Sequence, residues 1–92
     1  MKITESCGNV FLDLGFPPEE AEVLAMRADL MTRLSIMIRD RGLTQQAAAK
    51  MLGVKQSRLS DLVRGKFDRF SLDTLVTFAI RAGMHVEMHL AA

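Results

Sequence analysis

Apolar residues recur at helical spacing in the first half of the chain and predict a long helix. It runs from about Pro18 to Asp40, because a proline pair followed by three glutamates favours a helix start. At 100° per residue its apolar positions form one broad stripe, which consists of Val23, Leu24, Ala28, Leu30, Met31, Leu34, Met37 and Ile38. Arg27 interrupts this stripe. Gly42 ends the helix, since glycine tolerates positive φ.

Two short helices joined by a tight turn are predicted next. Thr44 is a good N-cap for a helix over residues 45–52, which Gly53 ends. A second helix over about 55–64 carries its apolar residues on one side, and these are Leu59, Leu62 and Val63. Its other side has nothing to bury and consists of Gln56, Ser57, Ser60, Asp61 and Arg64.

The C-terminal third predicts one more helix and a strand. Ser71 caps a helix, ended by Gly83, whose apolar residues are Leu72, Leu75, Val76, Ala79 and Ile80. From Met84 to Leu90 apolar and polar residues alternate, and this period of two predicts a strand. No earlier segment predicts a strand. The chain therefore divides into an N-terminal arm (residues 1–16), a helical domain (17–83) and a C-terminal strand and tail (84–92).

Composition narrows the class of protein. A chain of 92 residues with 49% hydrophobic content supports one domain with one modest core. The single cysteine, Cys7, excludes an internal disulfide and favours a reducing compartment. Because a signal-peptide core and long apolar runs are missing, we expect a soluble cytoplasmic protein without a membrane segment. No phosphate-binding glycine loop, distinctive carboxylate pair or nucleophile motif is present, so an enzyme is the least favoured class and no cofactor is expected.

The net charge of +1 conceals two parts of opposite sign. Residues 1–30 hold two basic and six acidic side chains, a net charge of −4, whereas residues 41–66 hold six basic and one acidic, a net charge of +5. A basic segment of this density is a candidate for binding a phosphate backbone, and a solvated helix face accounts for it equally well.

The two short helices around Gly53 have the features of a helix-turn-helix motif, over about residues 44–65. The small side chain of Ala49 lets the helices cross closely, and glycine permits the turn. Leu59 and Leu62 hold the second helix at an angle to the first. Its polar side is then free to enter the major groove of DNA.

These residues resemble the Xre-type helix-turn-helix of phage repressors and Cro proteins. The resemblance is carried by Gln45-Gln46-Ala47-Ala48-Ala49, Leu52-Gly53-Val54, the run from Gln56 to Leu62, and Arg64-Gly65-Lys66. With Ser6 to Phe16, Arg41 to Gln45 and Arg69 to Leu75, the chain is similar to small bacterial Xre-family regulators, including HigA-type antitoxins. The resemblance implies a mainly α, lambda-repressor-like bundle of four to five helices. It also implies a homodimer that represses its own operon at a palindromic operator, and a RelE/HigB-like toxin as partner.

The resemblance further implies roles for the polar residues of the motif. Base contacts are expected from Gln56, Ser57, Ser60 and Asp61, and phosphate contacts from Thr44, Gln45, Lys55, Arg58, Arg64 and Lys66. Gln56 is the best base reader, because a glutamine can bond to N6 and N7 of adenine together. Asp61 either accepts from N4 of cytosine or repels a nearby phosphate and so restricts register.

The predicted strand offers two faces. We expect its apolar face to pair with the same strand of a second subunit, and this dimerisation face consists of Met84, Val86, Met88 and Leu90. The alternative is that the strand lies on the helices of its own chain. The opposite face carries His85, Glu87 and His89, and we expect it to be solvated rather than to bind a metal.

The arm is too apolar for a free tail, since it contains Val10, Phe11, Leu12, Leu14 and Phe16. It is expected to dock on the helices of its own chain, or else to bind a toxin whose basic surface suits the acidic neighbours of the arm. Overall, the sequence predicts a sequence-specific DNA-binding transcriptional regulator. The alternative is a protein-interaction module that mainly inhibits a toxin or another protein, with DNA binding secondary.

Overall fold

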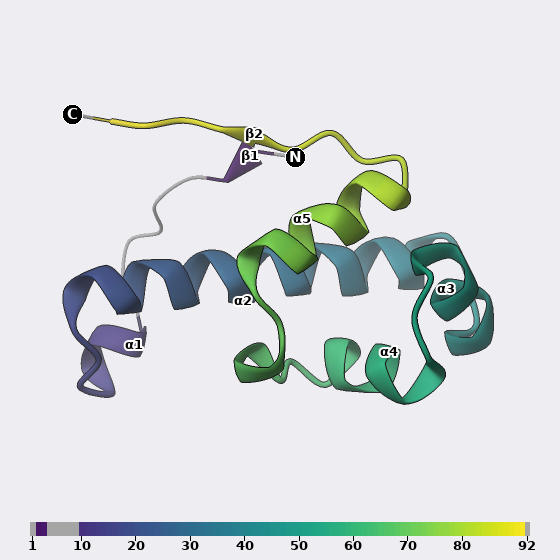
Figure 1. Ribbon diagram of the computed structural model, residues 1–92, viewed down its shortest axis with the longest axis horizontal. Coiled ribbons are helices and arrows are strands. Elements are labelled where there is room, and N and C mark those ends of the chain that lie inside the picture. The colour runs from purple at the N-terminus through teal and green to yellow at the C-terminus, as the bar shows by residue number, and fades with distance from the viewer. Residues whose placement is uncertain (1, 4–9, 92) are drawn as a thin grey trace.

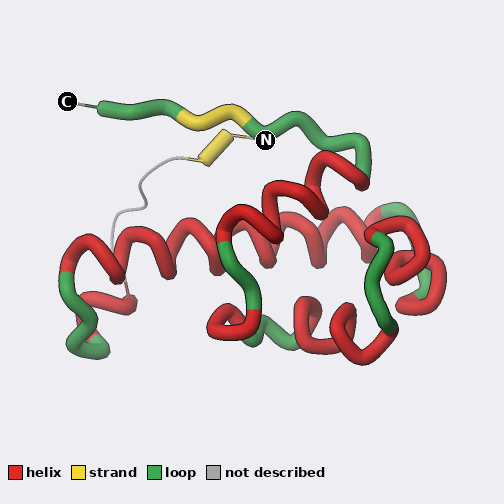
Figure 2. Tube along the Cα trace, in the orientation of Figure 1, coloured by secondary structure: helices red, strands yellow, loops and turns green. Residues whose placement is uncertain are grey.

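The long helix α2 is the element around which the others are arranged (Figures 1 and 2). The computed structural model describes residues 2–3 and 10–91, and Cys7 with the rest of 4–9 lies outside this range. The elements in chain order are β1 (Lys2–Ile3), α1 (Val10–Asp13), α2 (Pro18–Asp40), α3 (Gln45–Leu52), α4 (Gln56–Val63), the 3-10 helix η1 (Phe67–Arg69), α5 (Leu72–Arg81) and β2 (Glu87–Met88). The protein is thus mainly helical, and the four predicted helices are present.

Local chemistry explains where these helices begin and end. Pro18 and two glutamates occupy the first turn of α2, where a missing N–H and negative charge are favourable. The hydroxyl of Thr44 accepts a hydrogen bond from the backbone of Ala47 and caps α3, and Ser71 caps α5 in the same way. Both N-caps are those that the sequence predicts.

One apolar core joins α2 to α3, α4 and α5. Leu30, Leu34, Leu52, Leu59 and Leu75 are completely buried in it. The predicted stripe of α2 therefore faces the core, with one exception at its N-terminal end. Val23 is 38% exposed, because the elements that cover α2 there contact the side of Ala21 and Leu24 instead.

Two arginines hold the ends of neighbouring helices together. The guanidinium of Arg81 donates a 2.7 Å hydrogen bond to the carbonyl oxygen of Leu52, the last residue of α3. Arg41, which follows α2, donates a 3.0 Å bond to the carbonyl oxygen of Ala82 at the end of α5. Both bonds use carbonyl groups that have no partner within their own helix, so they connect α5 to the helix-turn-helix and to α2.

Residues 10–16 of the predicted arm pack on the N-terminal half of α2. Phe11 is 6% exposed and forms a second, smaller core with Ala21 and Leu24. Its ring meets the ring of Phe67 in η1 edge to face, with 5.0 Å between centroids. Phe67 also packs against the main core, so it connects the two apolar clusters.

The C-terminal strand is shorter than the sequence predicts. Only Glu87 and Met88 are in strand conformation, and they pair in parallel with Lys2 and Ile3 of the same chain (Figure 1). The expectation that no earlier segment forms a strand is therefore wrong. An alternating pattern favours extended backbone, but a ladder extends only as far as another segment runs beside it, and here that segment is two residues long.

The turn between α3 and α4 makes a testable demand on Gly53. Its φ is +71°, and a Cβ at this position would lie 3.1 Å from Nη1 of Arg81. We expect Gly53→Ala to lower the free energy of unfolding by about 2–3 kcal/mol, because backbone strain adds to a disturbed Arg81–Leu52 hydrogen bond. Thermal denaturation followed by circular dichroism measures the loss.

Gly42 provides the matched control for this prediction. Its φ is +63°, and a Cβ there would meet no atom within 4 Å. Gly42→Ala should therefore cost only the backbone strain, about 1 kcal/mol. Equal losses of stability in the two variants would show that the contact with Arg81 contributes nothing.

Candidate nucleic-acid interface

Helices α3 and α4 pack against each other as the two arms of a helix-turn-helix. Ala48 and Ala49 are buried where the helices meet, while Ala47 faces outward. Gly53 adopts the left-handed conformation, and the next residue, Val54, donates a 2.9 Å hydrogen bond back to the carbonyl oxygen of Ala49. This bond closes the turn and sets the start of α4.

Helix α4 buries one face and leaves the opposite face uncovered. Leu59 and Leu62 are 0% and 1% exposed, which fixes the rotation of the helix about its axis. With that rotation, Gln56 and Ser57 are exposed and Ser60 is half-buried at the side of the same face. Hydroxyl and amide groups on an uncovered helix face can read base edges in a major groove.

Two basic residues lie at the two ends of this face. Lys55 is the N-cap of α4 and Arg64 is its C-cap, and both are exposed. Among the residues that the structure describes, neither makes an ion pair. Nine residues along a helix axis span about 13 Å, close to the roughly 12 Å width of the major groove. The spacing suits contacts to phosphates on both sides of a groove.

The N-terminus of α3 contributes two more of the predicted residues. Thr44 and Gln45 are both exposed, and Thr44 is already engaged as the acceptor of the Ala47 N–H. The Thr44 hydroxyl keeps its own hydrogen for donation to a further acceptor.

Three other cations of the basic segment are engaged within the chain. Arg41 caps α5 through Ala82, as described above. Arg58 is half-buried, donates a 3.1 Å hydrogen bond to the carbonyl oxygen of Arg69, and lies with its guanidinium 4.4 Å from the centre of the Phe70 ring. The dense positive charge of residues 41–66 is thus divided between structural contacts and an open surface.

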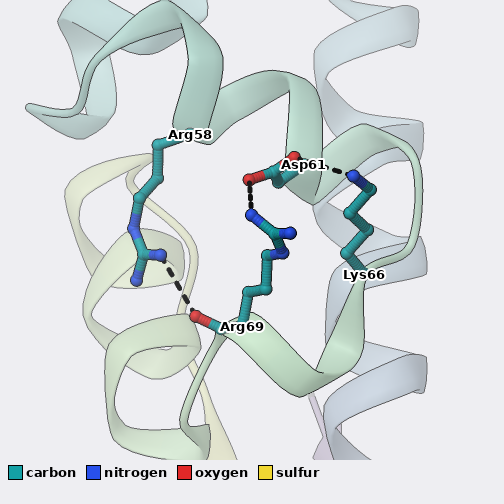
Figure 3. Close-up of polar contacts among 4 residues, drawn as sticks. All are labelled: Arg58, Asp61, Lys66 and Arg69. Atoms are coloured by element: carbon teal, nitrogen blue, oxygen red, sulfur yellow. Dashed lines mark hydrogen bonds and ion pairs between the residues drawn. The ribbon is translucent and has the colours of Figure 1, made fainter.

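Asp61 is the acidic centre of a small ion-pair cluster (Figure 3). One carboxylate oxygen lies 3.4 Å from Nζ of Lys66, and the other lies 3.4 Å from a guanidinium nitrogen of Arg69. The Asp61 side chain is 21% exposed, less than either cation. The structure therefore brings Asp61 and Lys66 together with Arg69, a residue that the sequence does not single out for this surface.

The surface next to α4 could not be found from periodicity alone. Arg69 lies in η1, a three-residue helix too short for a periodic signal, and Phe70 follows it directly. The available sequence signal was the alternation of charge in Lys66, Asp68 and Arg69 after the motif. Such a pattern indicates ion pairing without naming the partner.

The other candidate sites on the sequence receive less support. Nε2 of His85 and of His89 lie 3.6 and 3.3 Å from the two carboxylate oxygens of Glu87. In the part of the chain that the structure describes, no group of three or more histidine, cysteine or acidic residues is arranged to hold a metal ion. No helix of residues 10–91 is long and apolar enough to cross a membrane.

Comparison with known proteins agrees with this geometry. A family model described as a helix-turn-helix domain matches residues 10–91, which include α1, the motif and α5. None of the curated proteins matches the sequence. Because the model covers nearly the whole chain, including the arrangement of α3 and α4 described above, the protein belongs to the helix-turn-helix domain family of DNA-binding regulators.

Proposed function

We propose that this protein is a transcriptional repressor that binds a palindromic operator as a homodimer and regulates its own operon. The observation that carries the proposal is the uncovered polar face of α4, flanked at its ends by exposed Lys55 and Arg64. In this proposal Gln56, Ser57 and Ser60 contact bases. The phosphate contacts come from Thr44, Gln45, Lys55 and Arg64, with Lys66 beside them.

Repression would follow from occupancy alone. A dimer that covers a promoter sequence excludes polymerase from it, and no catalytic chemistry is required. Two recognition helices about 34 Å apart read two half-sites one helical turn from each other, which explains why such operators are palindromic. If two subunits make roughly six to ten phosphate contacts, the logarithm of affinity should fall by about 0.9 per contact for each tenfold rise in salt.

The proposed dimer interface is supported by the C-terminal segment. Met84 and Val86 are half-buried against the core of their own chain, whereas Met88 and Leu90 are 59% and 93% exposed. The outer half of the predicted dimerisation face thus carries large apolar side chains with no cover. A twofold-related copy of the same segment would bury them.

A second candidate function is inhibition of a protein partner, as in an antitoxin. It is supported by a surface on α1 and the start of α2, which we call the acidic apolar surface. Four exposed apolar residues, Val10, Leu12, Leu14 and Val23, lie there among the exposed acidic residues Asp13, Glu19 and Glu20. A basic protein with an apolar contact region, such as a RelE/HigB-like toxin, would complement this surface.

The repressor proposal predicts different effects for two residues of α4. Gln56→Ala should cost about 1–3 kcal/mol of discrimination at one or two base pairs of the operator. Arg64→Ala should weaken binding to all sequences alike and lower the slope against salt by about 0.9. Gel-shift titrations with the DNA upstream of the gene and with random duplex, at several salt concentrations, separate the two. Equal losses on both DNAs for Gln56→Ala would contradict its role, and a wild-type protein that binds neither DNA at low salt would reject the function.

The dimer proposal predicts a loss of association for Leu90→Asp. A charge placed on this exposed apolar residue should convert the wild-type dimer to monomer at micromolar concentration, because burying an unpaired carboxylate is costly. Sedimentation equilibrium measures the mass. Leu12→Asp, an equal change on the far surface of α1, is the matched control and should leave the dimer intact. A monomeric wild-type protein at this concentration would overturn the proposal.

The second function predicts that a partner binds the acidic apolar surface. Leu14→Asp should weaken binding of the adjacent gene's product by at least tenfold, as for loss of a buried apolar anchor. Isothermal titration calorimetry with the purified product measures the affinity, and Leu90→Asp serves as the control that should not change it. If the product is not basic, or if Leu14→Asp binds it as tightly as wild type, this function is rejected.

A further inference from the structure

Asp61 occupies a position on α4 that the reading of bases does not explain. It is the only acidic residue among the seven charged residues of segment 41–66, and it lies at the edge of the polar face. Both oxygens of its carboxylate face cations of the same chain, Lys66 on one side and Arg69 on the other (Figure 3). An acceptor engaged on both oxygens is poorly placed to accept from N4 of cytosine.

The contacts of Asp61 cross from α4 to the segment that follows it. Lys66 and Arg69 are five and eight residues further along the chain, beyond the end of α4. The backbone N–H of Lys66 also donates a 3.1 Å hydrogen bond to the carbonyl oxygen of Asp61. Backbone and side chain of one residue therefore hold the same turn.

Arg58 holds the other side of this turn. It lies three residues before Asp61, on the adjacent part of the helix surface, and its guanidinium bonds to the carbonyl oxygen of Arg69. The ring of Phe70 beneath that guanidinium is 2% exposed and belongs to the main core. Because this ring cannot move independently of the core, the position of Arg69 is set relative to α4.

We propose that Asp61 is a positioning residue that restrains Lys66 and Arg69 beside the recognition helix and offsets part of their charge. Arg69 is 55% exposed and Lys66 is 39% exposed, so both cations remain open to a phosphate. This proposal rests on the proposed DNA-binding function and adds Arg69 to the residues that approach the DNA backbone.

The consequence is a limit on binding to DNA of arbitrary sequence. Every duplex presents the same phosphates, so cations alone raise affinity for all sequences equally. A carboxylate held between two of these cations competes with the phosphates and repels them. Tight binding then requires the additional base contacts of α4, which only the correct operator supplies. Asp61 thereby favours specificity by weakening the binding of wrong DNA.

The test is Asp61→Asn, which removes the charge and keeps the shape of the side chain. We expect binding to random duplex to tighten by roughly three- to tenfold and its slope against salt to steepen by up to about 0.9. The ratio of operator to random affinity should fall. Introduced into Arg69→Gln, the same change should give a smaller gain, because one of the released cations is absent. Fluorescence anisotropy across a salt series provides all four values.

Asp29→Asn is the matched control. Asp29 pairs with Arg33 at 3.1 Å on α2, so this variant removes the same charge from the same kind of ion pair outside the motif. Equal tightening by the control would show an effect of net charge and overturn the proposal. So would unchanged or weaker binding of random DNA by Asp61→Asn, or an undiminished gain in Arg69→Gln. Loss of discrimination at a single base pair, with random DNA unaffected, would restore Asp61 as a base reader. A wild-type protein with no affinity for DNA would reject the proposed function and this inference with it.

Discussion

Burial of the apolar stripe of α2 is the constraint on which the rest of the structure depends. A 92-residue chain has room for one main core, and the completely buried Leu30 and Leu34 of α2 lie in it. Leu59 and Leu62 enter the same core from α4. The rotation of the recognition helix is thus decided by packing, and its polar face points outward because its apolar face has only one place to go.

The helices could be predicted because their signals are local. Caps such as Thr44 and Ser71 act within three residues, and apolar periodicity extends over each whole helix. The β1–β2 pair gives no such signal, since Lys2 meets Glu87 only after the whole chain between them has folded. The helix η1 is equally hidden, because its three residues are held by contacts from α1 and α4 rather than by their own pattern.

The same distinction applies to the candidate site. Periodicity places Gln56, Ser57 and Ser60 on the outer face of α4, and the burial of Leu59 and Leu62 agrees with it. It cannot distinguish a free cation from an engaged one. Arg58 and Lys55 are equivalent in a count of charge, but a buried aromatic ring and a backbone carbonyl lie within reach of the first. These partners come from the segment after the motif, so only the folded chain reveals them.

The helix η1 also brings the two candidate surfaces next to each other. Phe67 directly follows Lys66, and its ring contacts Phe11, which lies two residues from Asp13 in α1. Under the proposed functions, acidic side chains around α1 repel the DNA backbone at distances within about one Debye length, ~10 Å at 0.1 M salt. A basic partner on α1 would neutralise them, while the same partner could press on Phe67 and shift the turn that Asp61 holds. The two effects act on DNA affinity through different terms, since only the first is screened by salt. The dependence of the coupling on salt therefore identifies which of them operates.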